Sequence, residues 1–236
     1  MSKIEWFKNG LKAGVPIALG YFAVSFTFGM MAIAGGLSVG EAVLISATNL
    51  TSAGQFAGLT IILSNGSYVE MILSQLIINL RYCLMSFSLS QKLDRSESWN
   101  HRFGIAFGVT DEIYAVSVSQ KGKVSALFNY GAMAVAIPGW VFGTLCGALL
   151  GNILPSFIVS ALSVAIYGMF IAIIIPPAKH NKNILYVVIA SMILSTCFAY
   201  LPLLNKVSSG FVIIICTLVV SLLAAKFAPI KEDEYE

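Results

Sequence analysis

The chain has 236 residues and a formal net charge of +3, and 58% of its residues are hydrophobic whereas only 11% are charged. Soluble domains carry about 25% charged residues, so the composition excludes a water-soluble enzyme and indicates a protein embedded in a lipid bilayer. No charged residue occurs between Lys123 and Lys179, which leaves room for two membrane-spanning helices of about 20 residues each. We therefore expect a single membrane-embedded domain over residues 1–236.

The hydropathy pattern predicts an all-α integral membrane protein, a polytopic bundle of about eight hydrophobic segments, some of them broken or re-entrant. In chain order the segments cover residues 13–36, 41–63, 67–91, 102–119, 125–151, 156–177, 184–204 and 208–227. Before the first segment, Ile4, Phe7 and Leu11 share one helix face, so we expect a short amphipathic helix at the membrane interface.

The distribution of lysine and arginine indicates which segments cross the membrane. If all eight segments crossed, the connection that holds Lys92, Arg95 and Arg102 would lie outside the cytoplasm, against the usual preference of basic residues for the cytoplasmic side. We therefore expect segments 41–63 and 102–119, the two least like plain lipid-facing helices, to enter and return on the same side. The N-terminus then lies in the cytoplasm.

A polar stretch at residues 48–55 interrupts the second segment. Its Asn, Thr and Ser side chains compete for backbone hydrogen bonds and its glycine lowers the helix preference, so we expect the helix to unwind there. The backbone N–H groups that unwinding frees, together with the helix dipole, would bind an anionic group such as a carboxylate. The candidate substrate-binding or pathway residues in this stretch are Asn49, Thr51, Ser52, Gly54 and Gln55. Close helix packing through small residues is the alternative, but it does not explain Asn49 and Gln55.

The third segment carries a charge deep in the membrane. Arg81 lies about ten residues before the basic loop that ends this segment, which is roughly 15 Å along a helix and places the guanidinium near the middle of the bilayer. This is too deep for the side chain to reach the interface by snorkelling. Its neighbours Asn79 and Tyr82 are polar, and we count all three among the candidate pathway residues.

The fourth segment holds two acids, Asp111 and Glu112. A charge at the centre of a membrane helix costs about 2.5 to 3.5 kcal/mol, so we expect Arg81 to pair with one of the two acids. Adjacent helix positions point about 100° apart, so the second acid remains available to accept a proton or to hold a substrate ammonium group. The alternative is a salt bridge that only keeps two helices in register.

Other features of the sequence predict no reaction chemistry. The four cysteines are widely separated inside apolar runs, which fits neither disulfide pairing nor a metal site, and we expect no cofactor, no metal and no nucleic-acid partner. No GxxxxGK[ST] loop for nucleotide binding is present, so an ion gradient is the expected driving force. Gly143, Gly147 and Gly151 have the spacing of close helix contact, either within the chain or with a partner subunit.

Four motifs, in this order and spacing, resemble the AzlC family, the large subunit of two-component branched-chain amino acid exporters of the azaleucine-resistance type. They are Gly14-Val15-Pro16, Ser52-Ala53-Gly54-Gln55-Phe56-Ala57, Ile78-Asn79-Leu80-Arg81-Tyr82 and Thr110-Asp111-Glu112. Two departures are the order Ser-Ala-Gly-Gln in place of Gly-Ala-Ser-Gln and a tyrosine, Tyr82, where histidine is common. The resemblance implies export of leucine, isoleucine, valine or similar amino acids across a bacterial cytoplasmic membrane, together with a small hydrophobic AzlD-type subunit.

Combined with this resemblance, the residues predict a proton-coupled secondary exporter in which Arg81, Asp111 and Glu112 supply the charge pair and the proton site. A channel or carrier for another small solute would use the same polar lining, and a subunit that only supports a partner would not need the acids. A membrane-embedded protease is a further alternative, but it requires two acids that converge from different helices. Away from their ends, the spans offer only Asp111 and its neighbour, so we predict that the protein is not an enzyme.

Overall fold

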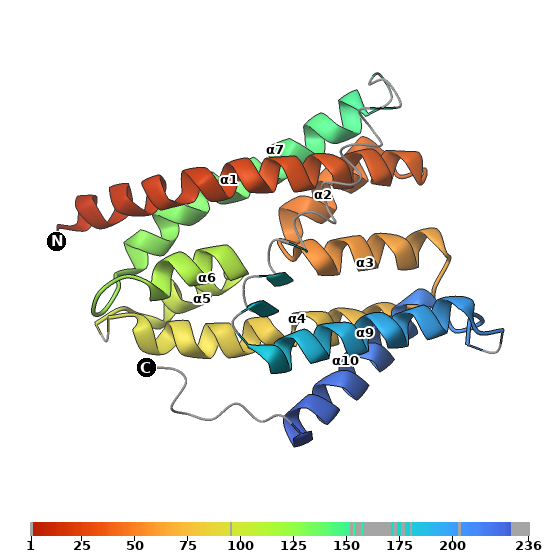
Figure 1. The fold of residues 1–236 in the computed structure, drawn as a ribbon. Helices are drawn as coiled ribbons and strands as arrows, with labels where there is room; N and C mark the ends of the chain where they lie inside the picture. The colour runs from red at the N-terminus through yellow and green to blue at the C-terminus, as the bar shows by residue number, and fades with distance from the viewer. Residues whose placement is uncertain are drawn as a thin grey trace. The chain divides into compact units, whose positions relative to one another are not determined.

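The computed structural model describes residues 2–94, 96–151, 181–202 and 204–227, with isolated positions between 152 and 180. These residues are almost all helical, and the helices that follow are shown in Figure 1. They are α1 (Lys3–Ala34), α2 (Val39–Thr48), α3 (Ser52–Leu63), α4 (Tyr68–Lys92), α5 (Trp99–Phe107), α6 (Asp111–Val118), α7 (Ala126–Leu150), α9 (Lys182–Tyr200) and α10 (Ser209–Phe227).

Five of these helices, α1, α4, α7, α9 and residues Gly210–Phe227 of α10, are long and apolar enough to cross a membrane. The all-α membrane fold is therefore confirmed. The predicted segments 41–63 and 102–119 each appear as two shorter helices, α2 with α3 and α5 with α6, so the expectation that these two segments are broken is also confirmed. The predicted segment 156–177 lies outside the described residues apart from isolated positions.

Helix α1 begins earlier than predicted. Ser2 accepts a hydrogen bond from the backbone N–H of Glu5 while the Glu5 carboxylate accepts one from the backbone N–H of Ser2, a capping box that starts the helix at Lys3. The expected amphipathic helix is therefore the first part of α1 and not a separate element. An equivalent capping box between Ser38 and Glu41 starts α2.

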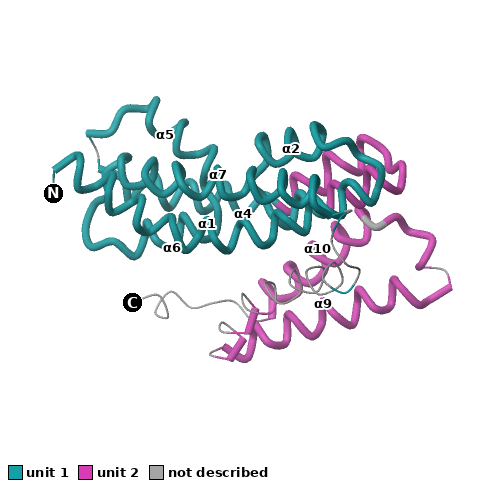
Figure 2. The backbone as a smooth tube through the Cα atoms, turned by 90° about the horizontal axis from the view of Figure 1, so that it is seen from above, with its two compact units in different colours: residues 1–56, 79–166 teal, residues 57–78, 167–236 magenta. Residues whose placement is uncertain are grey.

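The chain divides into two compact units, which Figure 2 shows in different colours. Unit 1 holds residues 1–56 and 79–166, and unit 2 holds residues 57–78 and 167–236. Both α3 and α4 contribute residues to each unit, because the division falls within these helices. The prediction of one membrane-embedded domain over residues 1–236 is not tested by this division.

Unit 1 is built on a close contact between α1 and α7. Gly14 of α1 lies against the backbone of Ala132 in α7, and Gly29 lies against that of Ala148. The later residue of α1 contacts the later residue of α7, so the two helices run in the same direction, as Figure 1 also shows. Small residues let helix backbones approach closely in a membrane, so this pair is the framework of the unit.

The glycines predicted to make close contacts lie in this interface. A Cβ atom added to Gly143 would meet the carbonyl oxygen of Phe22 at 2.6 Å, and one added to Gly147 would clash with the backbone of Phe26. Both contacts are between α7 and α1 of the same chain, so the alternative of internal packing is confirmed for these two positions.

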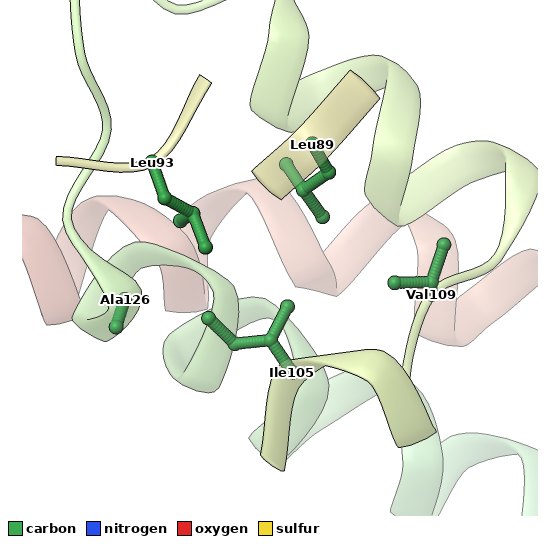
Figure 3. Close-up of a cluster of buried hydrophobic side chains, with 5 residues drawn as sticks. All are labelled: Leu89, Leu93, Ile105, Val109 and Ala126. Carbon is green, nitrogen blue, oxygen red and sulfur yellow. The ribbon is translucent and has the colours of Figure 1, made fainter. Parts of the chain in front are cut away.

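The part of α4 in unit 1 runs opposite to α1. At one end of the unit, the Trp6 and Phe128 rings lie 6.2 Å apart and Leu93 forms a backbone bridge with Val124, so the start of α1, the start of α7 and the end of α4 meet there. A buried cluster, shown in Figure 3, joins the same end of α4 to α5 and α7. Its members are Leu89, Leu93, Ile105, Val109 and Ala126.

These directions bear on the membrane topology. Two helices that cross a bilayer in opposite directions are joined by a connection that leaves and returns on one side. If α1, α4 and α7 all cross, then α2 with α3 returns to the side it left, and α5 with α6 does the same at the opposite side. Opposite directions of α1 and the unit 1 part of α4 are what re-entry of segment 41–63 would require, and re-entry of the two broken segments stays a prediction.

In unit 2, α10 is anchored by an acid at the start of α4. The buried carboxylate of Glu70 accepts hydrogen bonds from the Ser208 hydroxyl at 2.5 Å and the Gly210 backbone N–H at 2.9 Å. An acid at this position satisfies N–H groups that the first turn of a helix leaves without intrahelical partners. Glu70 therefore stabilises the N-terminus of α10 through these two hydrogen bonds.

Candidate functional site

The first helix break separates α2 from α3. Helix α2 ends at Thr48, and Asn49 has extended backbone angles, φ −139° and ψ 115°. The Asn49 side-chain oxygen accepts a hydrogen bond from the backbone N–H of Thr51 at 2.9 Å, an alternative to helical bonding that asparagine commonly provides. The predicted unwinding is therefore confirmed, and α3 begins only at Ser52.

Two buried hydroxyl groups at this break have no partner in the described part of the chain. The Thr51 Oγ1 and Ser52 Oγ atoms are buried and have no hydrogen-bond partner among the residues that the structure describes. Few buried polar atoms in native proteins remain unpaired, and leaving one so costs about 1–3 kcal/mol. These hydroxyls are suited to a polar ligand at the start of α3.

Gln55, by contrast, is engaged at both ends of its amide. Its Nε2 donates to Ser46 Oγ at 2.5 Å, and its Oε1 accepts a hydrogen bond from the Trp140 indole N–H at 3.1 Å. Ser46 also lies 2.6 Å from the Thr144 hydroxyl, and all four side chains are almost fully buried. The observed contacts of Gln55 fix the first break against α7, and a role in substrate binding stays a prediction.

The second helix break separates α5 from α6. Helix α5 ends at Phe107 with Gly108 as its C-cap, and Thr110 caps α6 by accepting a hydrogen bond from the backbone N–H of Ile113 at 3.3 Å. Asp111 and Glu112 therefore occupy the first turn of α6. Acids in this position are stabilised by the positive end of the helix dipole, typically by about 0.3–1 kcal/mol for an exposed group.

Arg81 pairs with the first of the two acids. Its Nη1 lies 2.9 Å from Asp111 Oδ2, and the two side chains remain 45% and 37% exposed. The guanidinium also lies 5.0 Å from the centre of the Tyr82 ring and donates to the Tyr82 hydroxyl at 3.3 Å. The expected charge pair is thus present, and its exposure leaves both charges accessible to a ligand.

Glu112 is held by a residue that sequence reasoning did not identify. The Tyr21 hydroxyl of α1 lies 2.6 Å from Glu112 Oε2 and 2.5 Å from Thr110 Oγ1. The Tyr21 ring also packs edge-on against Trp140, with centroids 5.4 Å apart and planes at 74°. The sequence indicated Tyr21 only as a tyrosine in a mostly apolar segment. Ser46 and Thr144 were likewise only single polar residues within hydrophobic segments.

The predicted site residues therefore fall into two groups. Arg81, Tyr82 and Asp111 form one cluster with Glu112 beside it, and Asn79, whose amide oxygen is buried, lies two positions before Arg81 on α4. The second group is at the first break and consists of Asn49, Thr51, Ser52, Gly54 and Gln55. The contact between Tyr21 and Trp140 connects the two groups.

Comparison with known proteins identifies the family. The family model described as "AzlC protein" matches residues 16–154, more than half of the chain. An uncharacterized membrane protein of Archaeoglobus fulgidus is 36% identical over 76% of this chain and 79% of its own length, and one from Helicobacter pylori is 26% identical over the same shares. The inner membrane protein YgaZ of Escherichia coli is 30% identical over 62% of this chain and 61% of its own length. No solved structure gives a significant match. With both broken segments and all the candidate site residues inside the matched region, the chain belongs to the AzlC protein family.

Proposed function

We propose that this membrane protein is a secondary active exporter of branched-chain or similar hydrophobic amino acids, driven by the proton gradient and working with a small AzlD-type membrane subunit. The observation that carries the proposal is the accessible ion pair between Arg81 and Asp111 at one of two helix breaks, with Glu112 as a second acid beside it. Membership of the AzlC family supports a membrane transporter in general terms.

An exposed ion pair is a suitable binding site for a zwitterion. The guanidinium of Arg81 matches a carboxylate in charge and geometry, and the carboxylate of Asp111 matches an ammonium group. An amino acid can therefore replace the bond between Arg81 and Asp111 with one bond to each residue. No net charge has to be transferred from water in this exchange, because the two protein charges and the two substrate charges remain paired.

The first helix break offers a second set of polar contacts. The N-terminus of α3 carries the positive end of a helix dipole, and the Thr51 and Ser52 hydroxyls are suited to hydrogen bonds with a ligand. Broken helices of this kind bind substrates in many secondary transporters. Here the break would contact the substrate carboxylate at a different stage of transport or line its path.

Glu112 supplies the proton site in this proposal. Among the described residues Arg81 is paired with Asp111, and the second acid has a neutral partner, the Tyr21 hydroxyl, in place of a cation. A carboxylate that lacks a cationic partner in a membrane protein can take up a proton without breaking an ion pair. Loading and release of that proton would then drive export across the cytoplasmic membrane.

The direct test is transport by purified protein in proteoliposomes together with its AzlD-type partner. Vesicles loaded at acidic pH and diluted into alkaline buffer should accumulate radiolabelled leucine or valine as protons leave, and excess unlabelled leucine should compete. Lysine and glutamate serve as substrates that should not move. Absence of leucine and valine transport would overturn the proposal. A leucine flux that does not saturate with leucine concentration would indicate a channel.

A further inference from the structure

We infer that Tyr21 and Trp140 couple the protonation of Glu112 to the first helix break, so that proton binding at one break changes substrate affinity at the other. This inference rests on the proposed function, because it explains how the two sites of one exporter communicate. It assigns a positioning role to two residues of the α1 and α7 framework that carry no charge.

The first step of the coupling is the bond between Tyr21 and Glu112. A phenol has one hydrogen to donate, and the ionised Glu112 carboxylate at 2.6 Å is its stronger acceptor. The Tyr21 hydroxyl also lies 2.5 Å from Thr110 Oγ1, the N-cap of α6. When Glu112 takes up a proton it becomes a weaker acceptor and can itself donate, so the contact that holds the Tyr21 hydroxyl weakens.

The second step is the contact between the two aromatic rings. Tyr21 packs edge-on against Trp140 at 5.4 Å, and Trp140 is 1% exposed. A buried ring with so little free space moves only when its neighbours move, since protein interiors are closely packed. A shift of the tyrosine ring is therefore transmitted to the indole.

The third step reaches the first helix break. The Trp140 indole N–H donates to Gln55 Oε1, and Gln55 Nε2 donates to Ser46 Oγ. Ser46 lies in α2 and Gln55 in α3, so this chain of bonds holds the helices on both sides of the break. A displaced indole would change how α2 and α3 are held, and with them the hydroxyl groups of Thr51 and Ser52.

Other charged and titratable groups near Glu112 belong to the site already described. Helix α4 contributes Arg81 and Tyr82, α6 contributes Asp111, and α1 contributes Tyr21. Arg81 and Asp111 are paired with each other. Tyr21 is the one among them that also contacts α7 through Trp140, which is why it can pass the protonation state of Glu112 to the other break.

The variant Tyr21→Phe separates coupling from transport, because it keeps the ring against Trp140 and removes only the hydroxyl. The wild-type protein, with its partner subunit in proteoliposomes, should bind leucine with an affinity that changes about tenfold or more between pH 5.5 and pH 8. In Tyr21→Phe this change should shrink to less than about twofold, while leucine exchange at equal pH on both sides persists and proton-driven accumulation is lost. Tyr130→Phe is the matched control, since its hydroxyl contacts His101 and not Glu112.

Trp140→Phe provides a second test that does not depend on Tyr21→Phe being stable. It retains an aromatic ring but removes the N–H that donates to Gln55, so it should also weaken the pH dependence of leucine affinity. Thermal unfolding in detergent identifies variants that fail to fold. Full pH dependence in a folded Tyr21→Phe or Trp140→Phe protein would overturn the coupling and leave the proposed exporter intact. Absence of leucine exchange in the wild-type protein would instead overturn the exporter and the coupling together.

Discussion

The two helix breaks differ in what they offer a solute. The first break presents uncharged hydroxyl groups and backbone, and a buried hydrogen-bond chain through Gln55 fixes it to α7. The second break presents two acids in a helix first turn, one of them paired with an exposed arginine. One break is therefore suited to bind without changing charge, whereas the other can change its charge by taking up a proton. The difference suggests a division between substrate contact and energy coupling, and four variants test it.

The largest expected effect is from Arg81→Gln, which removes the cation that Asp111 and a substrate carboxylate share. Loss of a hydrogen bond to a charged group is worth about 1.5–3 kcal/mol, so leucine binding should weaken by roughly 10- to 100-fold. Lys92→Gln, at the end of the same helix, is the matched control and should bind leucine normally. Normal leucine affinity in Arg81→Gln would show that the ion pair only holds helices in register.

Glu112→Gln should abolish proton-driven accumulation but keep exchange. The amide cannot be ionised, and it occupies the same space while accepting a weaker hydrogen bond from Tyr21, as the protonated acid does. We expect accumulation in a pH gradient to fall about tenfold or more, with leucine exchange at equal pH close to that of the wild-type protein. Glu41→Gln, at the cap of α2, controls for loss of an acid elsewhere. Unchanged accumulation in Glu112→Gln would show that Asp111 or another group binds the proton.

Thr51→Val should have a moderate effect that does not depend on pH. It removes a buried hydroxyl without a partner among the described residues but keeps the shape of the side chain. A neutral hydrogen bond contributes about 0.5–1.5 kcal/mol, so leucine affinity should fall by roughly 2- to 12-fold at every pH. Thr196→Val, whose exposed side chain bonds only to its own helix in the structure, should have no effect. An unchanged affinity in Thr51→Val would mean that the first break does not contact the substrate.

Gln55→Leu should mainly lower stability. It leaves the buried Trp140 N–H without its acceptor and removes the donor to Ser46, and an unsatisfied buried group costs about 1–3 kcal/mol. The midpoint of thermal unfolding in detergent should fall by several degrees, and the pH dependence of leucine affinity should weaken as in Trp140→Phe, because the same chain of bonds is broken. Wild-type stability combined with lost binding would instead place Gln55 in direct contact with the substrate.

Much of the fold could be predicted because hydropathy and helix breaking are local properties. The break after Thr48 follows from asparagine, threonine and glycine in one stretch, and the need to pair Arg81 follows from its depth. The acid that Arg81 selects depends on how α4 lies against α6, which no local pattern determines. The roles of Tyr21 and Trp140 depend in the same way on the packing of α1 against α7, and each residue alone is an ordinary aromatic side chain in an apolar segment.

The glycine contact between α1 and α7 has a consequence for how the protein can move. Because Gly143 and Gly147 leave no room between the two backbones, these helices cannot slide past each other without separating. We therefore expect α1 and α7 to move as one unit during transport, and α6, at the second break, to move relative to them. Spin labels placed on α1 and α7 should therefore keep one separation throughout the transport cycle, whereas a label on α6 should change its distance from both.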